Sequence, residues 1–542
     1  MSHPSRSIRT RVAVTAVATA LVAAACGSGS PTTPSQSSPT VAPLTVATSS
    51  GTLTGTDVGD TRQFLGVRYA QPPTGERRWT LPQAVDARGA QVDATRPGAP
   101  CEQSAPTPGL PTPSEDCLFL NVTTPRSTTP STRLPVMVWW HGGGYTTGTG
   151  AAYDAQRLAD TGDVMVVTVN YRLGIFGYLG LPDLKGGGDF GFADQLESLH
   201  WVQRNAAAFG GDPDNVTVFG ESAGGMSTCA ALTSPSARGL IDKAIISSGS
   251  CALDFPTGAF YPGVPQERPY TSATDSAATG VDAARALGCQ GSAGLGCLRS
   301  LPVARLLTQN ENFSNVLAYG TPLLPRDPRQ AVADGDTLRV PIISGGNRDE
   351  NDAFTAGALA ADPTAYTAAS YPSDLRAAYG DRADDVATRY PLSRFASAPA
   401  ALARTFTDAG WACPTVRSNR QYAQHAPVYS YEFADQTGPN VSGASSAQIP
   451  AAAFHANDLP YVFDLNGRDL VPRNPQAALS RSMIEYWTSF ARTGTPTAAG
   501  APAWPRTTAQ SAPVLGFTSS GVRVVDHTAD HQCDFWSGVS LR

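Results

Sequence analysis

Lysine is almost absent from this chain, and no stretch gathers basic side chains into a stripe. Only two of the 39 basic residues are lysines, Lys185 and Lys243, and the formal net charge at pH 7 is −6. A protein whose main partner is nucleic acid or an anionic membrane surface carries clustered positive charge, because that charge contacts phosphate groups. The charge pattern therefore argues against both partners.

Two cofactor signatures are also missing. The cysteines and histidines do not have the spacing of a zinc site, and no glycine-rich loop has the spacing of a phosphate-binding loop. We therefore expect neither a metal nor an organic cofactor. Hydrophobic residues make up 41% of the chain, which is typical of a globular protein with a large core.

Residues 1–25 are predicted to be a signal peptide. Three arginines, at 6, 9 and 11, precede "VAVTAVATALVAAA", which is apolar but too short for a comfortable membrane span. The following "LVAAAC" resembles the lipidation signal of bacterial lipoproteins, although Ala23 stands where leucine is commonest. We predict lipidation of Cys26. In the alternative, ordinary cleavage after Ala-Ala-Ala leaves Cys26 without a role.

The number of cysteines favours lipidation. The chain has nine, so a lipid on Cys26 leaves eight that can pair in an oxidising compartment. We expect an exported protein, either a cell-surface lipoprotein or a secreted one, that meets the membrane only through this anchor. Residues 26–45 are rich in Gly, Ser, Pro and Thr and are predicted to be a flexible tether.

The remaining chain, residues 46–542, is predicted to form one α/β domain. Short β-branched apolar runs indicate strands buried on both faces of a mostly parallel sheet. Helical patterns lie between the runs, for example at 189–211, and this alternation is typical of a doubly wound α/β core. We expect helical insertions above the sheet at about 255–335 and 355–450. The apolar runs lie at 134–140, 164–170, 215–220, 243–249 and 339–345.

One serine stands in a setting that can make it a nucleophile. In "FGESAGGMS", Ser222 follows an apolar run and precedes a segment that can start a helix. Glycines at 220 and 224 allow the close backbone approach that a sharp strand-turn-helix needs. Such an elbow exposes the serine hydroxyl and places the Ala223 N–H at a helix start, where it can donate to an oxyanion.

A second glycine-rich stretch lies upstream. "HGGGY", residues 141–145, comes directly after the apolar run at 134–140. Alone it indicates only a turn. Paired with the elbow at Ser222, it predicts an oxyanion loop in which the N–H groups of Gly143 and Gly144 face a ligand.

The chain resembles the type B carboxylesterases, a family that includes cholinesterases, mammalian liver carboxylesterases and bacterial para-nitrobenzyl esterases. This resemblance implies an α/β-hydrolase fold, with a mostly parallel central sheet, flanking helices and helical insertions. The matching stretches run in order through the body of the chain. They are "FLGVRYAQPPTGERRW", "SEDCLFLNV", "VMVWWHGGGY", "VNYRLGIFGYL", "FGGDPDNVTVFGESAGG", "GGNRDENDAF", "FHANDLPYVF", "MIEYWTSFARTGTP" and "CDFW".

The resemblance also implies partners for Ser222. The family's acid matches Glu350 in "GGNRDEN", with Asp349 and Asp352 as neighbouring alternatives, and the family's base matches His455 in "FHANDLPYVF". Ser248 matches a serine that supports the triad from behind. A base is required because a serine hydroxyl is barely ionised at pH 7, and the acid fixes the tautomer of the imidazole. The competing histidines downstream of Ser222 are His425, His527 and His531.

The cysteines fit the same resemblance. It implies three disulfides, Cys101–Cys117, Cys289–Cys297 and Cys413–Cys533. Cys229 and Cys251 remain, either as two buried thiols or as an additional bridge near the elbow.

Two departures from the family pattern are informative. The segment 102–116 contains no aromatic residue, whereas cholinesterases carry a tryptophan there that holds the choline cation, so this chain is not expected to be a cholinesterase. Asp189 stands where the family often has asparagine, and we expect it to affect packing only.

The sequence therefore predicts a serine hydrolase that cleaves small carboxylic esters, of short to medium chain length, through an acyl-enzyme intermediate. The alternatives within this fold are a lipase, an amidase or a carbamate hydrolase. The alternative outside catalysis is a non-catalytic, cholinesterase-like binding protein. Such relatives lose the serine or its glycines, and both are present here.

Overall fold

The computed structural model describes residues 43–291, 294–539 and 541. The predicted signal peptide, the lipidation candidate Cys26 and all but the last three residues of the predicted tether lie outside this described part. These described residues group into one compact unit. No helix within the described ranges is long and apolar enough to cross a membrane.

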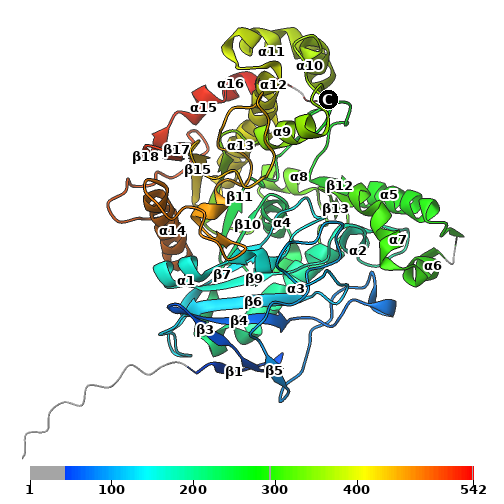
Figure 1. Ribbon diagram of the computed structural model, residues 1–542, viewed down its shortest axis with the longest axis vertical. Coiled ribbons are helices and arrows are strands. Elements are labelled where there is room, and N and C mark those ends of the chain that lie inside the picture. Colours follow the sequence, from blue (N-terminus) through cyan, green and yellow to red (C-terminus); the bar gives the residue numbers. More distant parts are fainter. Residues whose placement is uncertain (1–42, 292–293, 540, 542) are drawn as a thin grey trace, which may run out of the picture. The chain divides into compact units, whose positions relative to one another are not determined.

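A mixed sheet of eleven strands runs through the centre of this unit (Figure 1). Its middle strands, from β17 to β9 in spatial order, are parallel, and both edges are antiparallel. In spatial order the strands are β18 (Gly521–Val525), β17 (Val514–Thr518), β15 (Val428–Ala434), β14 (Ile342–Asn347), β11 (Lys243–Ser247), β10 (Gly211–Glu221), β7 (Leu134–Trp140), β9 (Met165–Val169), β6 (Phe119–Pro125), β4 (Thr61–Arg68) and β3 (Thr56–Val58).

The apolar runs form strands because both faces of the sheet are covered. Along β7, Val136, Val138 and Trp140 pack into one core, and Met137 and Trp139 pack into the other. Successive side chains of a strand point to opposite faces, so a strand between two cores buries the side chains of both faces and favours apolar residues at successive positions. This confirms the predicted α/β class and its mostly parallel sheet.

Helices on the two faces complete these cores. On one face, α3 (Phe190–Asn205) and α4 (Ala223–Ala231) contribute side chains to the larger core. On the other face, α1 (Gln156–Gly162) and α14 (Gln476–Thr493) pack against the same sheet. The serine-bearing elbow connects β10, a central strand of the sheet, to α4.

The segments between the central strands are largely helical. Short strands outside the large sheet form three small sheets, namely β1 (Thr45–Thr48), β2 (Gly51–Thr54) and β5 (Gln91–Asp93); β8 (Tyr153–Asp154) with β16 (Asp464–Leu465); and β12 (Tyr270–Ser272) with β13 (Leu317–Tyr319). The other α-helices are α2 (Gly174–Tyr178), α5 (Ala273–Ala286), α6 (Gly294–Ser300), α7 (Val303–Leu306), α8 (Pro328–Ala333), α9 (Asp352–Ala361), α10 (Tyr371–Tyr379), α11 (Ala383–Arg389), α12 (Ala398–Phe406), α13 (Cys413–Tyr422), α15 (His527–Asp530) and α16 (Cys533–Trp536).

One part of the predicted insertions is not an insertion. Within 355–450, residues Val428–Ala434 form β15, which lies between β14 and β17 in the central sheet. Its sequence "VYSYEFA" carries Ser430 and Glu432 among apolar residues, so it does not read as a doubly buried strand. Both polar side chains are buried and hydrogen-bonded, Ser430 to Asn419 and Glu432 to His531.

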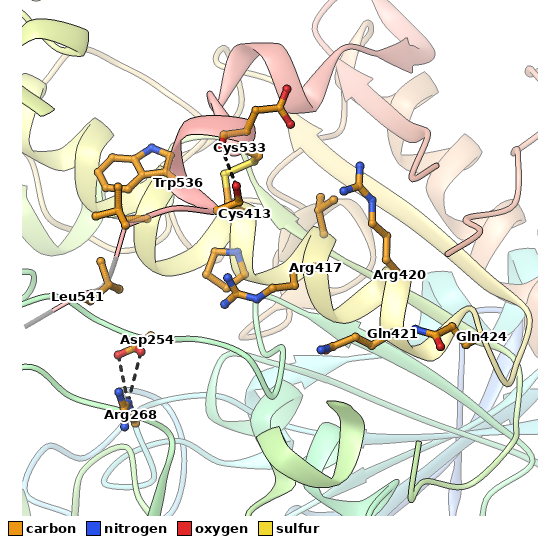
Figure 2. Close-up of a pocket in the computed structure, with 16 residues that line it drawn as sticks. Asp254, Arg268, Cys413, Arg417, Arg420, Gln421, Gln424, Cys533, Trp536 and Leu541 are labelled. Carbon is orange, nitrogen blue, oxygen red and sulfur yellow. Dashed lines mark hydrogen bonds and ion pairs between the residues drawn. A yellow bond between two sulfur atoms is a disulfide. The ribbon is translucent and has the colours of Figure 1, made fainter. Parts of the chain in front are cut away.

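Four disulfides stabilise the described chain. Three of them are the pairs that the resemblance implied. The fourth joins Cys229 to Cys251, which the sequence left open as either two buried thiols or an additional bridge. Figure 2 shows Cys413–Cys533, which ties α13 to α16 near the C-terminus. Disulfides are typical of proteins that fold in an oxidising compartment, so the protein is an exported one. The pairs are Cys101–Cys117, Cys229–Cys251, Cys289–Cys297 and Cys413–Cys533.

Asp189, at the start of α3, is fully buried and joins α3 to a distant segment. One carboxylate oxygen accepts from the Ala318 N–H at 3.0 Å, and the other accepts from the Thr321 hydroxyl at 2.7 Å. Burial raises the pKa of Asp189 to about 7, against the opposing effect of these hydrogen bonds. Asp189 therefore joins two elements by packing and hydrogen bonds. Its ionised form is disfavoured by burial, and an asparagine at this position would not carry that charge.

Candidate active site

The chain turns sharply at Ser222, between the end of β10 and the start of α4. The backbone of Ser222 has φ 54° and ψ −125°, a conformation that few residues other than glycine adopt. The Ser222 N–H donates to the Ser247 carbonyl at 3.0 Å, which fixes the turn to the end of β11. The side chain is half-buried and faces a cavity. This is the geometry of a nucleophile elbow.

Glycine at 224 is required by the packing of this turn. A Cβ on Gly224 would lie 1.9 Å from the Trp140 carbonyl oxygen at the end of β7. Any larger residue would push α4 away from the sheet and move the Ser222 hydroxyl.

The glycine-rich loop after β7 borders the same cavity. Gly143 has φ 104° and Gly144 has φ 59°, and both line the cavity together with Ser222. A Cβ on Gly143 would lie 2.3 Å from the Thr147 carbonyl oxygen, so this position excludes side chains. Ala223 is buried as the first residue of α4, where backbone N–H groups lack partners within the helix.

His141 holds this loop in place and is not a titrating group near pH 7. Its ring stacks on Tyr171 with 4.4 Å between centroids, and the Tyr171 hydroxyl donates to the His141 carbonyl at 2.6 Å. Burial lowers the pKa of His141 to about 4.

The structure brings Glu350 and His455 together although 105 residues separate them. His455 Nδ1 lies 2.5 Å from Glu350 Oε2, and both side chains are buried. Glu350 follows β14, and His455 lies in the loop before a short 3₁₀ helix, Leu459–Tyr461. His455 lines the same cavity as Ser222. The acid, the imidazole and the serine are thus arranged around one site.

The second carboxylate oxygen of Glu350 is also fixed. Its Oε1 accepts from the Ser248 hydroxyl at 2.5 Å and from the Asn347 N–H at 2.7 Å. Three donors therefore hold this carboxylate, and its orientation toward His455 cannot change without breaking one of them. Ser248, for which the resemblance implied a supporting role, thus lies against the Glu350 carboxylate.

Glu221 is a site residue that the sequence analysis did not recognise. It directly precedes Ser222 and is buried, and its Oε1 lies 3.2 Å from His455 Nε2. Burial raises the pKa of Glu221 to about 8. Burial alone lowers the pKa of His455, but the charges of Glu221 and Glu350 outweigh it and raise the pKa to about 9. The only signal for Glu221 was its place inside the quoted motif.

Asp458 is a second carboxylate that was not recognised. It is buried three residues after His455 and accepts from the Tyr431 hydroxyl at 3.3 Å. Burial, together with the charge of Glu350, raises the pKa of Asp458 to about 6.

The competing acids and histidines lie elsewhere. Asp349 pairs with Arg348 at 3.2 Å, and Asp352 begins α9. None of His425, His527 and His531 lines the cavity beside Ser222.

Glu432, His527 and His531 are the one described cluster with the composition of a metal site, since their potential ligand atoms lie within 4.8 Å of one another. However, both ring nitrogens of His531 already have partners, Asp408 at 2.5 Å and Glu432 at 2.7 Å. Burial opposes protonation of His531, but the surrounding carboxylates raise its pKa to about 9. The cluster is therefore a buried ion network that joins β15 to the C-terminal helices, and it does not require a metal.

The cavity beside Ser222 has a volume of about 870 Å³. Part of its wall is aromatic. A chain of ring contacts reaches His455, formed by Phe255, Phe260, Phe354 and Trp411. Phe354 and Trp411 each lie about 5 Å, centroid to centroid, from the His455 ring (5.1 and 5.0 Å). Such a cavity can hold a small, largely apolar molecule with its reacting group at Ser222.

Comparison with known proteins decides the family. A model of the carboxylesterase family matches residues 42–536. The chain belongs to the carboxylesterase family. It is accordingly a serine hydrolase that cleaves carboxylic esters, a type B carboxylesterase, as the resemblance implied.

Relatives with established names support this membership over most of their length. The chain is 34% identical to the para-nitrobenzyl esterase of Bacillus subtilis over 469 residues, which cover 83% of this chain and 90% of that one. It is 32% identical to the cocaine esterase of Homo sapiens over 483 residues, covering 82% and 81%. The solved structure of a thermophilic PNB esterase has a TM-score of 0.74 at 30% identity, covering 90% of this chain and 99% of that chain.

Proposed function

We propose that this carboxylesterase works through a triad of Ser222, His455 and Glu350. The observation that carries the proposal is the 2.5 Å contact between His455 and Glu350 at the wall of the cavity that Ser222 faces. Ser222 attacks the ester carbonyl, and His455 takes its proton. Glu350 holds the imidazole by its Nδ1–H and stabilises the imidazolium that forms.

The oxyanion is held by backbone N–H groups of Gly143, Gly144 and Ala223. The positive φ values at both glycines and the position of Ala223 at a helix start support this assignment. His455 then protonates the leaving alcohol, which leaves an acyl group on Ser222. In the second half of the reaction His455 activates water, and the acid product departs. Ser248 is a positioning residue for Glu350.

The substrate is a small dissolved ester of short to medium chain length. The cavity of about 870 Å³, whose lining includes several aromatic rings, supports this size. The relatives named for para-nitrobenzyl esters and for cocaine also support a compact ester.

The triad is tested by hydrolysis of para-nitrophenyl esters. Ser222→Ala and His455→Ala are expected to lower kcat on the order of 10⁴-fold or more, because each removes an essential step. His425→Ala is the matched control, since His425 lies away from the cavity, and it should retain full activity. Wild-type turnover by either of the first two variants would contradict the assignment.

We also infer that the exported protein is anchored through a lipid on Cys26. The supporting observations are the apolar N-terminal segment and the eight remaining cysteines, which all pair. Mass spectrometry of protein from the native membrane fraction should find a lipid-modified N-terminal Cys26. A soluble mature chain that begins at or after residue 26 without lipid would contradict the anchor.

A further inference from the structure

A short two-stranded ribbon separates the catalytic cavity from a second cavity. Phe255 and Glu267 form an isolated antiparallel bridge, with backbone N–H···O distances of 2.9 and 3.0 Å. Both side chains line the catalytic cavity beside Ser222. Their chain neighbours, Asp254 and Arg268, line a separate cavity of about 490 Å³ between the ribbon and α13 (Figure 2).

This alternation follows from the extended backbone of the ribbon, because successive side chains point to opposite faces. The consequence is a separation of charge. Arg268 Nε lies 3.3 Å from the Asp254 carboxylate on the far face, as the dashed lines in Figure 2 show. Arg329 also approaches Asp254 at 3.3 Å. Arg268 and Arg329 are therefore both paired with Asp254.

Glu267 presents a carboxylate without a cationic partner to the catalytic cavity. It makes no ion pair within the described chain, and the described residues that line the cavity include no lysine or arginine. The Asn315 side chain hydrogen bonds to Glu267, while burial raises the pKa of this carboxyl. The other carboxylate of the lining, Glu221, is already beside His455. A partly buried carboxylate without a countercharge is costly unless a ligand supplies the charge.

Aromatic rings line the same cavity as this carboxylate. Phe255, the backbone partner of Glu267, contacts Phe260 at 4.9 Å and Trp411 at 4.7 Å between ring centroids. Ring faces attract cations through their quadrupole, and a carboxylate beside them adds a hydrogen-bond acceptor. The combination suits a compact ammonium group.

We propose that Glu267, with the ring of Phe255, forms a subsite for the cationic group of an amine-bearing ester. This inference rests on the proposed triad, because the ester carbonyl must reach Ser222 while the amine lies at Glu267. No residue of the fully described segment 102–116 lines the catalytic cavity.

The test compares two isosteric esters, 2-(dimethylamino)ethyl butyrate, which is protonated at pH 7, and 3-methylbutyl butyrate, which is neutral. The wild-type protein should show a higher kcat/KM for the cationic ester. Glu267→Gln keeps the size of the side chain and removes its charge. It should lower the cationic-to-neutral ratio by roughly 10-fold to 100-fold, the worth of one hydrogen bond to a charged group. Turnover of the neutral ester should stay within about twofold, which also reports that the variant is folded.

Asp254→Asn is the matched control, because it removes one carboxylate from the same ribbon on the face that borders the other cavity. Asp254→Asn should leave the ratio unchanged. Glu267→Asp keeps the negative charge, so it should retain more of the preference for the cationic ester than Glu267→Gln does. The proposal is overturned if the wild-type protein hydrolyses both esters equally well. It is also overturned if Glu267→Gln lowers both rates alike, or if Asp254→Asn lowers the ratio as much as Glu267→Gln does. Failure of the wild-type protein to hydrolyse either ester would instead contradict the triad and the subsite together.

Discussion

At the scale of single residues, the chemistry depends on how two buried carboxylates share one imidazole. Glu350 meets His455 at Nδ1, and Glu221 lies 3.2 Å from Nε2, the nitrogen that must accept the proton of Ser222. Their charges raise the pKa of His455 to about 9 against the effect of burial. A general base must be neutral to accept a proton, so activity should rise as the pH increases through this pKa.

Removal of the Glu221 charge should change this pH dependence. In Glu221→Gln the imidazolium loses a stabilising charge, so the pKa of His455 falls and the acid limb of kcat/KM moves to lower pH. The measurement is a pH–rate profile with a neutral ester. Glu267→Gln removes a carboxylate elsewhere in the same cavity and should leave the acid limb in place. An acid limb at the same pH in Glu221→Gln and the wild type would show that Glu221 does not influence the base.

Gly143 gives a second prediction at this scale. A Cβ there would meet the Thr147 carbonyl at 2.3 Å, and the backbone has φ 104°. Gly143→Ala should therefore displace the loop and lower kcat on the order of 10²-fold, the effect of losing one oxyanion donor. The thermal midpoint checks that the fold survives. An unchanged kcat would argue that this loop does not hold the oxyanion.

At the scale of elements, Asp189 at the start of α3 makes the stability of the folded protein depend on pH. Its pKa in the folded protein is raised to about 7, above the 3.8 of an unperturbed aspartate. The folded state therefore binds this proton more tightly, and stability falls as the pH rises from about 4 through about 7. An asparagine at 189 does not ionise and avoids the cost of a buried charge. Asp189→Asn should therefore stabilise the protein above pH 7 by at most about 4 kcal/mol.

The measurement for Asp189→Asn is the difference in thermal midpoint from the wild type between pH 5 and pH 8. The difference should grow with pH. Asp194→Asn on the same helix is the contrasting variant, because it breaks the pair with Arg172 at 2.7 Å and leaves a buried guanidinium unpaired. It should destabilise the protein by about 3–5 kcal/mol. A midpoint difference for Asp189→Asn that does not vary with pH would contradict the account.

The same scale shows what sequence can predict. Strands β7, β10, β11 and β14 were recognisable because each contains a run of apolar residues whose side chains enter the two cores in alternation. Strand β15 was not recognisable, because the buried Glu432 has its partners, His527 and His531, far away in the sequence, His531 99 residues away. The elbow at Ser222 was readable because its glycines and serine are local. Glu350 and His455 came from the family resemblance, and the roles of Glu221 and Glu267 depend on tertiary placement that no local pattern records.

At the scale of the whole molecule, the disulfides close loops of very different length. Cys413–Cys533 spans 120 residues, and Cys289–Cys297 spans 8. In the chain-entropy view, the longer loop stabilises the folded state more, by about 5 against about 2.5 kcal/mol. Replacing both cysteines of the long-range pair by serine should therefore cost more stability than the same replacement in the short loop. Chemical denaturation of the two double variants measures this, and an equal or reversed order would contradict the view.

The central claim is that Ser222 is the nucleophile, and active-site labelling tests it most directly. Purified protein is treated with a fluorophosphonate, and peptide mass spectrometry locates the adduct. One adduct per chain on Ser222, absent from Ser222→Ala and strongly slowed in His455→Ala, is the predicted result. An adduct on another residue, or none in folded protein that hydrolyses esters, would contradict it.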